Sequence, residues 1–202
     1  MCIRDSWKDD RNLLPADGSP WNLAPIAASF MAGILRHLPA LMAVTTPSVN
    51  SYRRIKPHFW SGAYQAWGIA NKEAALRLVL DARHGLPTHF ELKTIDASAN
   101  PYLALASLIC AGVEGIRTQA QLPEPVEIDP GNFSDEERKE HGVAILPTNL
   151  GSALSAFSAD AVLRRAMGEE LARVFAAVRK SEMEHMQNMS LDEERGVLLE
   201  RY

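Results

Sequence analysis

Residues 88–103, which read THFELKTIDASANPYL, predict a strand, a turn and the start of a helix. In the strand, ionisable side chains alternate with apolar ones, His89, Glu91 and Lys93 against Phe90 and Leu92. Because successive side chains of a strand point to opposite faces, the three ionisable residues share one face. That face could hold a metal ion and phosphate oxygens. It could equally be a solvated sheet face with cross-strand charge pairs, which these residues taken alone favour.

The segments around this stretch predict the remaining parts of a mixed helix and strand fold. Strands are expected at residues 63–69, 76–80 and 88–95, and their short links suggest an antiparallel meander. Apolar helices are expected at residues 23–45, with Asn22 as N-cap, and from about residue 99 to 117, with Ser98 as N-cap. The expected fold class is α+β, an antiparallel sheet backed by helices.

The C-terminal third is expected to be helical. Residues 122–147 contain four prolines and an acidic-basic run that is typical of a solvated face, and they predict a long connection with one short helix near residues 134–141. Residues 150–202 predict a helical region. Its expected helices cover residues 150–157, 159–167, 169–187 and 191–201.

Composition limits the classes of function. The chain has 202 residues, which suits one large domain or two small ones, and its formal charge of −4 argues against nucleic acid as a partner. The two cysteines, Cys2 and Cys110, cannot form a disulfide framework or a cysteine metal site, which fits a reducing cytoplasm. The apolar run at residues 24–35 is followed by Arg36 and His37, so it suits a buried helix rather than a membrane span. His37 is then expected to be a hydrogen-bonded packing residue.

Residues 47–62 form an irregular segment whose first half is basic. Its polar and aromatic positions include Arg53, Arg54, Lys56, His58 and Trp60. Loops on a rigid scaffold often carry binding residues, although a solvated surface loop would have the same composition.

The first six residues, MCIRDS, show no folding pattern that connects them to the segment after Ser6. We therefore expect a truncated or non-native start at residues 1–6, with the native chain beginning further upstream.

Several motifs, in their order and spacing, resemble the catalytic domain of glutamine synthetase. The matching segments are Asn50-Ser51-Tyr52-Arg53-Arg54, Arg77, Glu91, Asn100-Pro101-Tyr102-Leu103 and Ala111-Gly112-Val113-Glu114-Gly115-Ile116. The resemblance extends from about residue 7 to residue 202, as the C-terminal part of that domain. Trp60-Ser61-Gly62-Ala63-Tyr64 and Phe90-Glu91-Leu92-Lys93 are similar to the nodulin-type, glutamine-synthetase-like branch.

The resemblance implies a fold and a reaction. The fold would be part of the curved, incomplete barrel of the synthetase catalytic domain. The reaction would be an ATP-dependent ligation in which glutamate is phosphorylated to γ-glutamyl phosphate and ammonia displaces the phosphate. The implied cofactors are ATP and Mg²⁺ or Mn²⁺, the implied assembly is a homo-oligomeric ring, and no membrane partner is expected.

The resemblance also assigns roles to residues. Arg54 matches the arginine that grips the substrate carboxylate, Arg77 matches an arginine at the nucleotide phosphates, and Glu91 matches a metal-coordinating glutamate. Arg54 and Arg77 are therefore the expected catalytic residues. His58, in the basic segment, is a further candidate for contact with substrate.

Four positions depart from the usual synthetase pattern. Trp60 stands where the family commonly has a glutamate in a mobile flap, which leaves room for an amine bulkier than ammonia. Lys72 replaces an arginine near the nucleotide, while His89 and Lys93 replace two arginines beside the metal glutamate. Lys72 and His89 are then expected at ATP, and Trp60 and Lys93 at substrate.

Three functions stay open from the sequence. The first is glutamine formation, and the second is ligation of glutamate to another amine. The third is a catalytically silent family member with a structural or regulatory role, which the loss of the flap acid and two arginines suggests. The resemblance places further metal ligands upstream of residue 7, so this chain alone is expected to be inactive.

Overall fold

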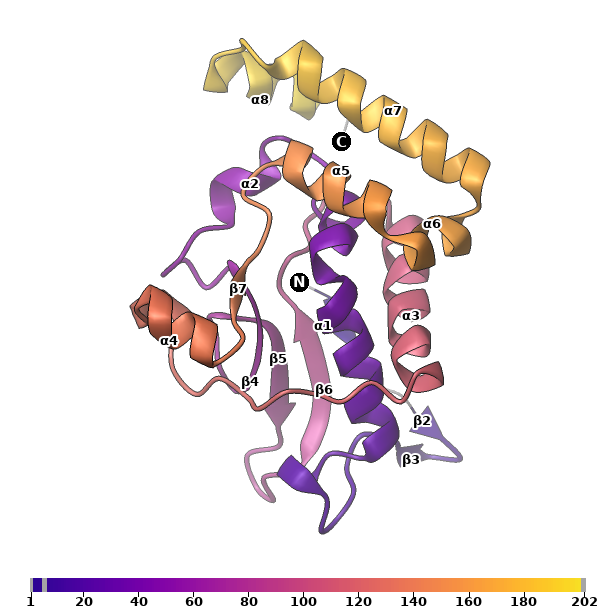
Figure 1. Cartoon of the computed structure of the whole chain (residues 1–202), viewed down its shortest axis with the longest axis vertical. Helices are drawn as coiled ribbons and strands as arrows, with labels where there is room; N and C mark the ends of the chain where they lie inside the picture. The colour runs from indigo at the N-terminus through magenta and orange to yellow at the C-terminus, as the bar shows by residue number, and fades with distance from the viewer. Residues whose placement is uncertain (1, 5–6, 201–202) are drawn as a thin grey trace.

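The computed structural model describes residues 2–4 and 7–200, and it is a mixed helix and sheet fold (Figure 1). Its strands are β1 Cys2–Arg4, β2 Trp7–Lys8, β3 Arg11–Asn12, β4 Tyr64–Ile69, β5 Ala74–Leu80, β6 Pro87–Leu92 and β7 Ala144–Ile145. Its α-helices are α1 Pro25–Thr45, α2 Ser51–Arg54, α3 Pro101–Arg117, α4 Asp135–Glu140, α5 Leu150–Ala159, α6 Ala161–Met167, α7 Glu169–Met186 and α8 Leu191–Leu199. Two short 3-10 turns are η1 Pro20–Asn22 and η2 Pro130–Asn132.

The main sheet has the order β1-β6-β5-β4-β7 and stays open, while β2 and β3 form a separate hairpin. The α+β class is therefore confirmed. The antiparallel meander is wrong in one pairing, because β4 and β5 run parallel while the other neighbours are antiparallel. The link between β4 and β5 is not a hairpin turn: Ala70 has a φ of 53°, and the Asn71 side-chain amide donates to the carbonyls of Val126 and Ile128.

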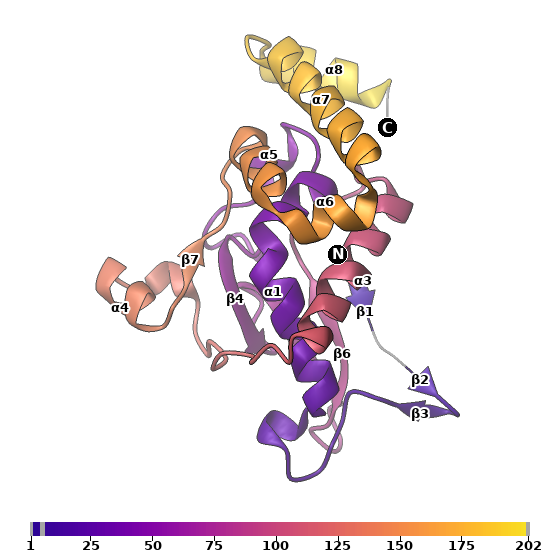
Figure 2. The same ribbon diagram turned by 45° about the vertical axis from the view of Figure 1, so that its right-hand side comes forward.

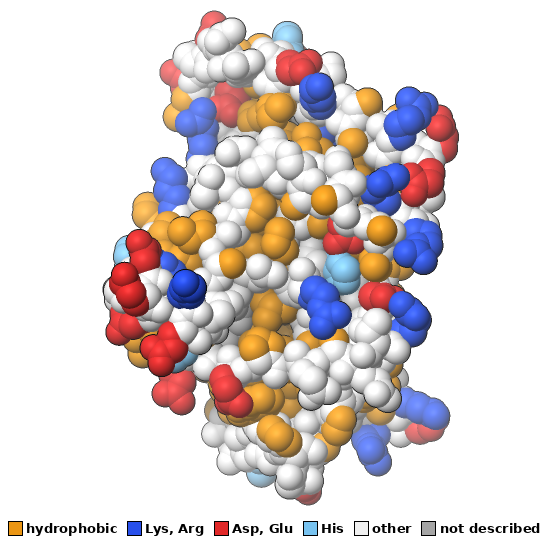
Figure 3. Space-filling model, viewed as in Figure 1, with side chains coloured by type: hydrophobic (Ala, Val, Ile, Leu, Met, Phe, Trp, Pro, Cys, Tyr) orange, Lys and Arg blue, Asp and Glu red, His pale blue; other side chains and the backbone are white. Residues whose placement is uncertain are grey.

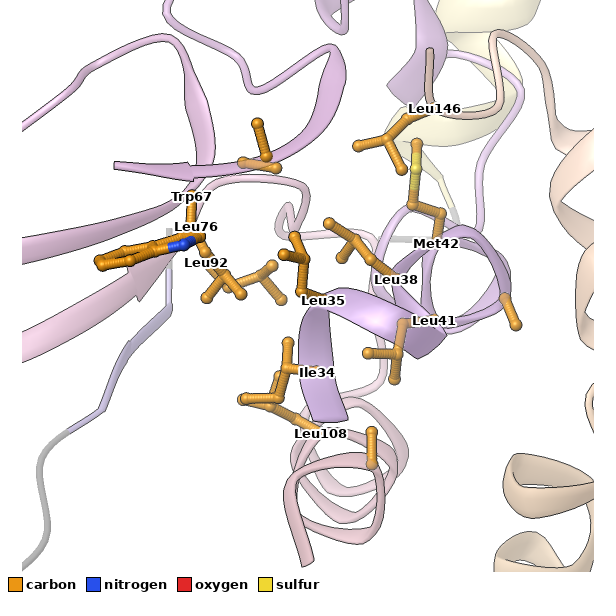
Figure 4. Packing of buried hydrophobic residues seen from close by; sticks show 14 of the residues in the cluster. Ile34, Leu35, Leu38, Leu41, Met42, Trp67, Leu76, Leu92, Leu108 and Leu146 are labelled. Atoms are coloured by element: carbon orange, nitrogen blue, oxygen red, sulfur yellow. The ribbon is translucent and has the colours of Figure 1, made fainter. Parts of the chain in front are cut away.

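Helix α1 lies at the centre of the core. It packs against α3 and α5 and against the sheet. In Figure 4 its apolar side chains point toward the sheet on one side and toward α3 on another, through Ile34, Leu35, Leu38, Leu41 and Met42. By length and composition α1 could cross a membrane, but most of its residues from Met31 onward are buried inside the protein. It is the core helix of this fold, as the sequence predicts.

Glycines let α1 and α3 approach each other closely. A Cβ on Gly115 would lie 2.1 Å from the Ser29 carbonyl oxygen and 2.7 Å from the Gly33 backbone. A Cβ on Gly112 would lie 2.3 Å from the Phe30 ring. At Gly115 a side chain would require the backbone to shift, and at Gly112 it would displace the Phe30 ring, so both glycines allow α1 and α3 to pack closely.

Each of the two expected helix caps is displaced by two residues. Asn22 lies in η1 with a φ of 52°, and Ala24 is the N-cap of α1. In α3, the Asn100 side chain accepts from the amides of Tyr102 and Leu103, so Asn100 rather than Ser98 is the N-cap. Pro101 follows at the first helical position, where its missing N–H costs nothing.

The C-terminal helices form a layer over one end of α1 and α3. Figures 1 and 2 show α5 and α6 beside these helices, and α7 and α8 beyond them. The long connection before them contains α4, as expected, and also β7, which adds an unexpected strand to the sheet edge. Acidic side chains gather over α4 in Figure 3, so its charge run is a solvated face.

The two ends of the chain are only partly described. Residues 2–4 of the N-terminal segment pair with β6, but residues 1, 5 and 6 lie outside the described residues. The expectation of a truncated start therefore stays a prediction. The last predicted helix is α8, and Arg201 lies outside the described residues.

Candidate functional site

The candidate site is built on one face of β5 and β6. Arg77 and Glu91 are direct cross-strand partners, and the alternation of both strands turns their neighbours Leu76, Phe90 and Leu92 into the core. The Arg77 Nε donates to Glu91 Oε2 at 2.5 Å, and an Arg77 terminal nitrogen contacts the same oxygen. Glu91 is 3% exposed, so this carboxylate is largely removed from water and lies against the Arg77 guanidinium.

Two more ionisable residues, one in β6 and one directly after it, surround Glu91. His89 Nε2 lies 3.9 Å from Glu91 Oε1, and its Nδ1 is 2.9 Å from the Thr88 hydroxyl. Burial lowers the pKa of Lys93 below its ordinary value, and the charge of Arg77 lowers it further, against the opposite effect of Glu91. His89, Glu91 and Lys93 therefore share one face, as predicted, and Glu91 is its buried member.

The loop before β4 brings Trp60 to this group. The Lys93 Nζ donates to the Trp60 carbonyl at 3.2 Å, and the Lys72 Nζ lies 4.7 Å from the centre of the Trp60 ring. The Trp60 amide donates to Glu73 Oε1 at 2.9 Å. Trp60 has a φ of 53°, a conformation that non-glycine residues adopt at a cost and that often marks functional loops. Trp60, Lys72 and Lys93 are thus brought together.

Arg54 and His58, both in the basic segment, contact different parts of the chain. Arg54 lies at the end of α2, is exposed, and donates to the carbonyls of Lys93 and Ile95 at 3.3 Å each. It therefore adjoins the candidate site. The His58 Nδ1 lies 2.6 Å from Asp129 Oδ2, which ties His58 to the connection near η2 instead of to Glu91.

Glu73 is the residue of this site that the sequence analysis missed. It is 7% exposed, and its Oε2 is buried without a hydrogen-bond partner among the described residues. The signal for it in the sequence is weak: it is a single acid between Lys72 and the apolar start of β5. Its burial and its contact with the Trp60 amide appear only in the folded chain.

The residues present fit part of the ligand set of a metal site. Glu91 Oε1 makes no hydrogen bond within the described part of the chain, so it can coordinate a cation, and His89 stands beside it. In residues 7–200, however, no group of three or more His, Cys, Asp or Glu side chains is placed to hold a metal ion. Divalent cations such as Mg²⁺ take several oxygen ligands, and Glu91 supplies the oxygens of one carboxylate.

Comparisons with known proteins identify the class. A match to the family described as "Glutamine synthetase, catalytic domain" covers residues 5–196. The chain belongs to this family. Members of the family use ATP and a divalent metal, and they are ligases.

Individual relatives agree with that class. The chain is 40% identical over 189 residues to a γ-glutamylpolyamine synthetase (GlnA3) of Streptomyces coelicolor, covering 93% of this chain and 41% of the relative. It is 39% identical over 175 residues to a glutamine synthetase of Halobacterium salinarum, covering 87% of this chain and 38% of the relative. The chain thus spans about two-fifths of the length of these curated relatives.

Solved structures have the same fold. A crystal structure described as a novel glutamine synthase homolog superposes with a TM-score of 0.74 at 33% identity, covering 90% of this chain and 40% of that one. A GmaS complex with ADP gives a TM-score of 0.78 at 30% identity, covering 98% and 45%. The predicted family and fold class are confirmed, whereas the nodulin-type branch stays a prediction.

Proposed function

We propose that this chain is the C-terminal catalytic part of an ATP-dependent ligase that joins the side-chain carboxylate of glutamate to ammonia. The observation that carries the proposal is the buried Glu91 carboxylate paired with Arg77 on a sheet face that also holds His89 and Lys93. A buried acid among several cations suits a reaction in which phosphate oxygens and carboxylates meet.

The residues take distinct roles in this proposal. Glu91 would hold a divalent cation, Mg²⁺ or Mn²⁺, through Oε1, the oxygen that faces His89, and that ion would neutralise charge on the phosphate oxygens when bound. Arg77, with its guanidinium on the same face, would contact the nucleotide phosphates, with Lys72 and His89 nearby. Arg54 would bind the glutamate carboxylate, a task that suits the two-pronged guanidinium.

The proposed reaction has two steps. The γ-phosphoryl group of ATP passes to the glutamate side-chain carboxylate, which gives ADP and γ-glutamyl phosphate. The amine nitrogen then forms a bond to the acyl carbon, phosphate leaves with the electrons of its C–O bond, and the nitrogen gives up a proton. The positive charge of Arg54, Arg77 and Lys93 favours the negative charge that develops on oxygen in both steps.

An activity assay of the full-length protein tests the role of Glu91. The Glu91→Ala variant is expected to lose metal-dependent ADP release, by at least a hundredfold, because the buried cation ligand is removed while the core face of β6 is unchanged. Glu136→Gln on the exposed surface of α4 serves as the matched control and should retain full activity. Undiminished turnover of Glu91→Ala would rule out the proposal.

Trp60 favours a second candidate for the amine substrate that accepts the glutamyl group. Its exposed ring stands where the resemblance places the flap acid, and a relative that is 40% identical is named as a γ-glutamylpolyamine synthetase. We therefore propose an organic amine as the rival acceptor to ammonia. Assaying ADP release from ATP and glutamate with ammonia, a monoamine and a polyamine separates the two, and no turnover with any of them would leave the catalytically silent member as the answer.

The setting of the proposed enzyme follows from its substrates. ATP and glutamate are cytoplasmic metabolites, and we expect the protein to work there as a homo-oligomer. The assembly as a ring is an expectation from the family resemblance. Size measurement of the full-length protein in solution checks it.

A further inference from the structure

An exposed tryptophan and a buried glutamate are joined at the edge of the candidate site. Trp60 is 64% exposed, whereas Glu73 is 7% exposed. The Trp60 backbone amide donates to Glu73 Oε1 at 2.9 Å, so this hydrogen bond ties the backbone of residue 60 to the Glu73 carboxylate. Neither the family resemblance nor the roles proposed for the other site residues give Glu73 a task.

The second carboxylate oxygen of Glu73 is left unsatisfied by the residues that the structure describes. Glu73 Oε2 is buried and makes no hydrogen bond within that part of the chain. A buried polar atom without a partner is costly, and in native proteins it is rare. Holding the Trp60 amide needs only Oε1, so a purely structural role for Glu73 leaves Oε2 unexplained. An ammonium group would satisfy it.

The Trp60 ring already holds an ammonium group. The Lys72 Nζ lies 4.7 Å from the ring centre, within the distance at which the negative face of an indole attracts a cation. Lys72 is exposed, and its long side chain can swing away from the ring. The lysine ammonium therefore stands in for an alkylammonium ligand at this surface.

We propose that Trp60 and Glu73 form a subsite for one ammonium group of a diamine or polyamine. This inference rests on the proposed ligase function and names its acceptor class. One nitrogen of the acceptor stays charged and is held by the Trp60 ring and Glu73 Oε2 after Lys72 moves aside. Another nitrogen of the same molecule, in its neutral form, attacks the acyl carbon of γ-glutamyl phosphate, displaces phosphate and gives up its proton to water.

Amine binding to the 202-residue chain tests the subsite without any turnover. Calorimetric titration with 1,4-diaminobutane at low salt is expected to show binding, and 1,4-butanediol, which has the same length but no charge, should not bind. Glu73→Gln keeps an oxygen for the Trp60 amide but removes the charge and replaces the second oxygen by an NH2 donor, so its affinity for the diamine is expected to fall at least tenfold. Trp60→Ala should cause a loss of similar size.

Two further variants test whether Lys72 competes with the diamine and provide a control. Lys72→Met removes the competing ammonium, so it is expected to bind 1,4-diaminobutane severalfold more tightly than the unchanged chain. Because Lys72 is exposed, this variant folds even if a change at Glu73 does not. Glu136→Gln removes an exposed acid of α4 outside the subsite, and its affinity should be unchanged.

The outcomes separate the subsite from the ligase function. The subsite would be overturned if the diamine failed to bind. It would also be overturned if Glu73→Gln and Trp60→Ala bound the diamine as tightly as the unchanged chain, or if Lys72→Met bound it more weakly. Turnover of the full-length protein with ammonia alone would then leave the ligase function standing. Diamine binding that follows the expected pattern, together with no ADP release with any amine, would uphold the subsite and overturn the ligase function.

Discussion

Single residues of this chain carry charge in places that water hardly reaches. The Glu91 carboxylate is paired with Arg77, and the Asp160 carboxylate is paired with His37. His37 Nδ1 lies 2.6 Å from Asp160 Oδ2, which confirms His37 as a hydrogen-bonded packing residue between α1 and the start of α6. Each such pair replaces the hydration that its charges lose, so removal of one partner is expected to cost more than removal of a surface charge.

Asp160 makes stability depend on acid pH. Burial pushes the pKa of Asp160 up, but the hydrogen bond from His37 and those from the Leu163 and Val162 amides outweigh it, and the pKa lies below its ordinary value. A carboxyl whose pKa is lowered by folding stabilises the native state above its unfolded pKa of about 4, and this stabilisation is lost as the pH falls through the folded pKa.

The Asp160→Asn variant separates charge from capping. Its side-chain oxygen can still accept from the Val162 and Leu163 amides, but it has no charge for His37. We expect it to be less stable than the unchanged chain at pH 6 by about 1–2 kcal/mol, and this difference should shrink as the pH falls below about 4. Urea unfolding from pH 3 to 6 measures this, and a difference that stays constant over that range would contradict it.

At the scale of elements, α1 and α3 pack closely against each other through glycines. Gly115→Ala is expected to lower the free energy of unfolding by about 2–3 kcal/mol, because the new methyl would meet backbone atoms of Ser29 and Gly33. Gly196→Ala in α8 is the matched control, since nothing lies within 4 Å of its added Cβ, and it should stabilise by about 0.5–1 kcal/mol. Equal effects in urea unfolding would contradict the close approach.

A second contact between elements joins α8 to α2. Glu194 is buried and accepts from Arg53 Nε at 3.0 Å and Nη2 at 2.5 Å. Because the Arg53 side chain is about half exposed, Glu194→Gln is expected to cost only about 1 kcal/mol. The amides of α8 should then exchange hydrogen faster while those of α1 do not. Unchanged exchange in α8 would show that Arg53 does not hold it.

At the scale of the whole molecule, the donor set limits what this chain can do by itself. Glu91 has one carboxylate, and residues 7–200 contain no group of three or more His, Cys, Asp or Glu side chains placed to hold a metal ion. We therefore expect the purified 202-residue chain to release no ADP from ATP and glutamate above background at millimolar Mg²⁺ or Mn²⁺. A coupled ADP assay measures this, with the full-length protein as positive control. Glutamate-dependent turnover by the chain alone would contradict it.

Much of the fold can be predicted from local pattern. The apolar stretches that become α1 and α3, the capping box of Ser190 and Glu193, and the strand that carries Glu91 all follow from periodicity and end signals. The parallel pairing of β4 with β5 does not, because a short link between two strands is typical of an antiparallel hairpin, and here the link instead contacts distant residues, with Asn71 donating to the carbonyls of Val126 and Ile128.

The sequence by itself determined the family, the α+β class and the common face of His89, Glu91 and Lys93, because motif spacing and strand alternation are local properties. Only the tertiary structure decided that Glu91 is buried against Arg77, that His58 turns to Asp129, and that Glu73 lies beneath the Trp60 loop with one oxygen unpaired among the described residues. Burial and partners depend on segments that are distant in sequence and meet only in the folded chain.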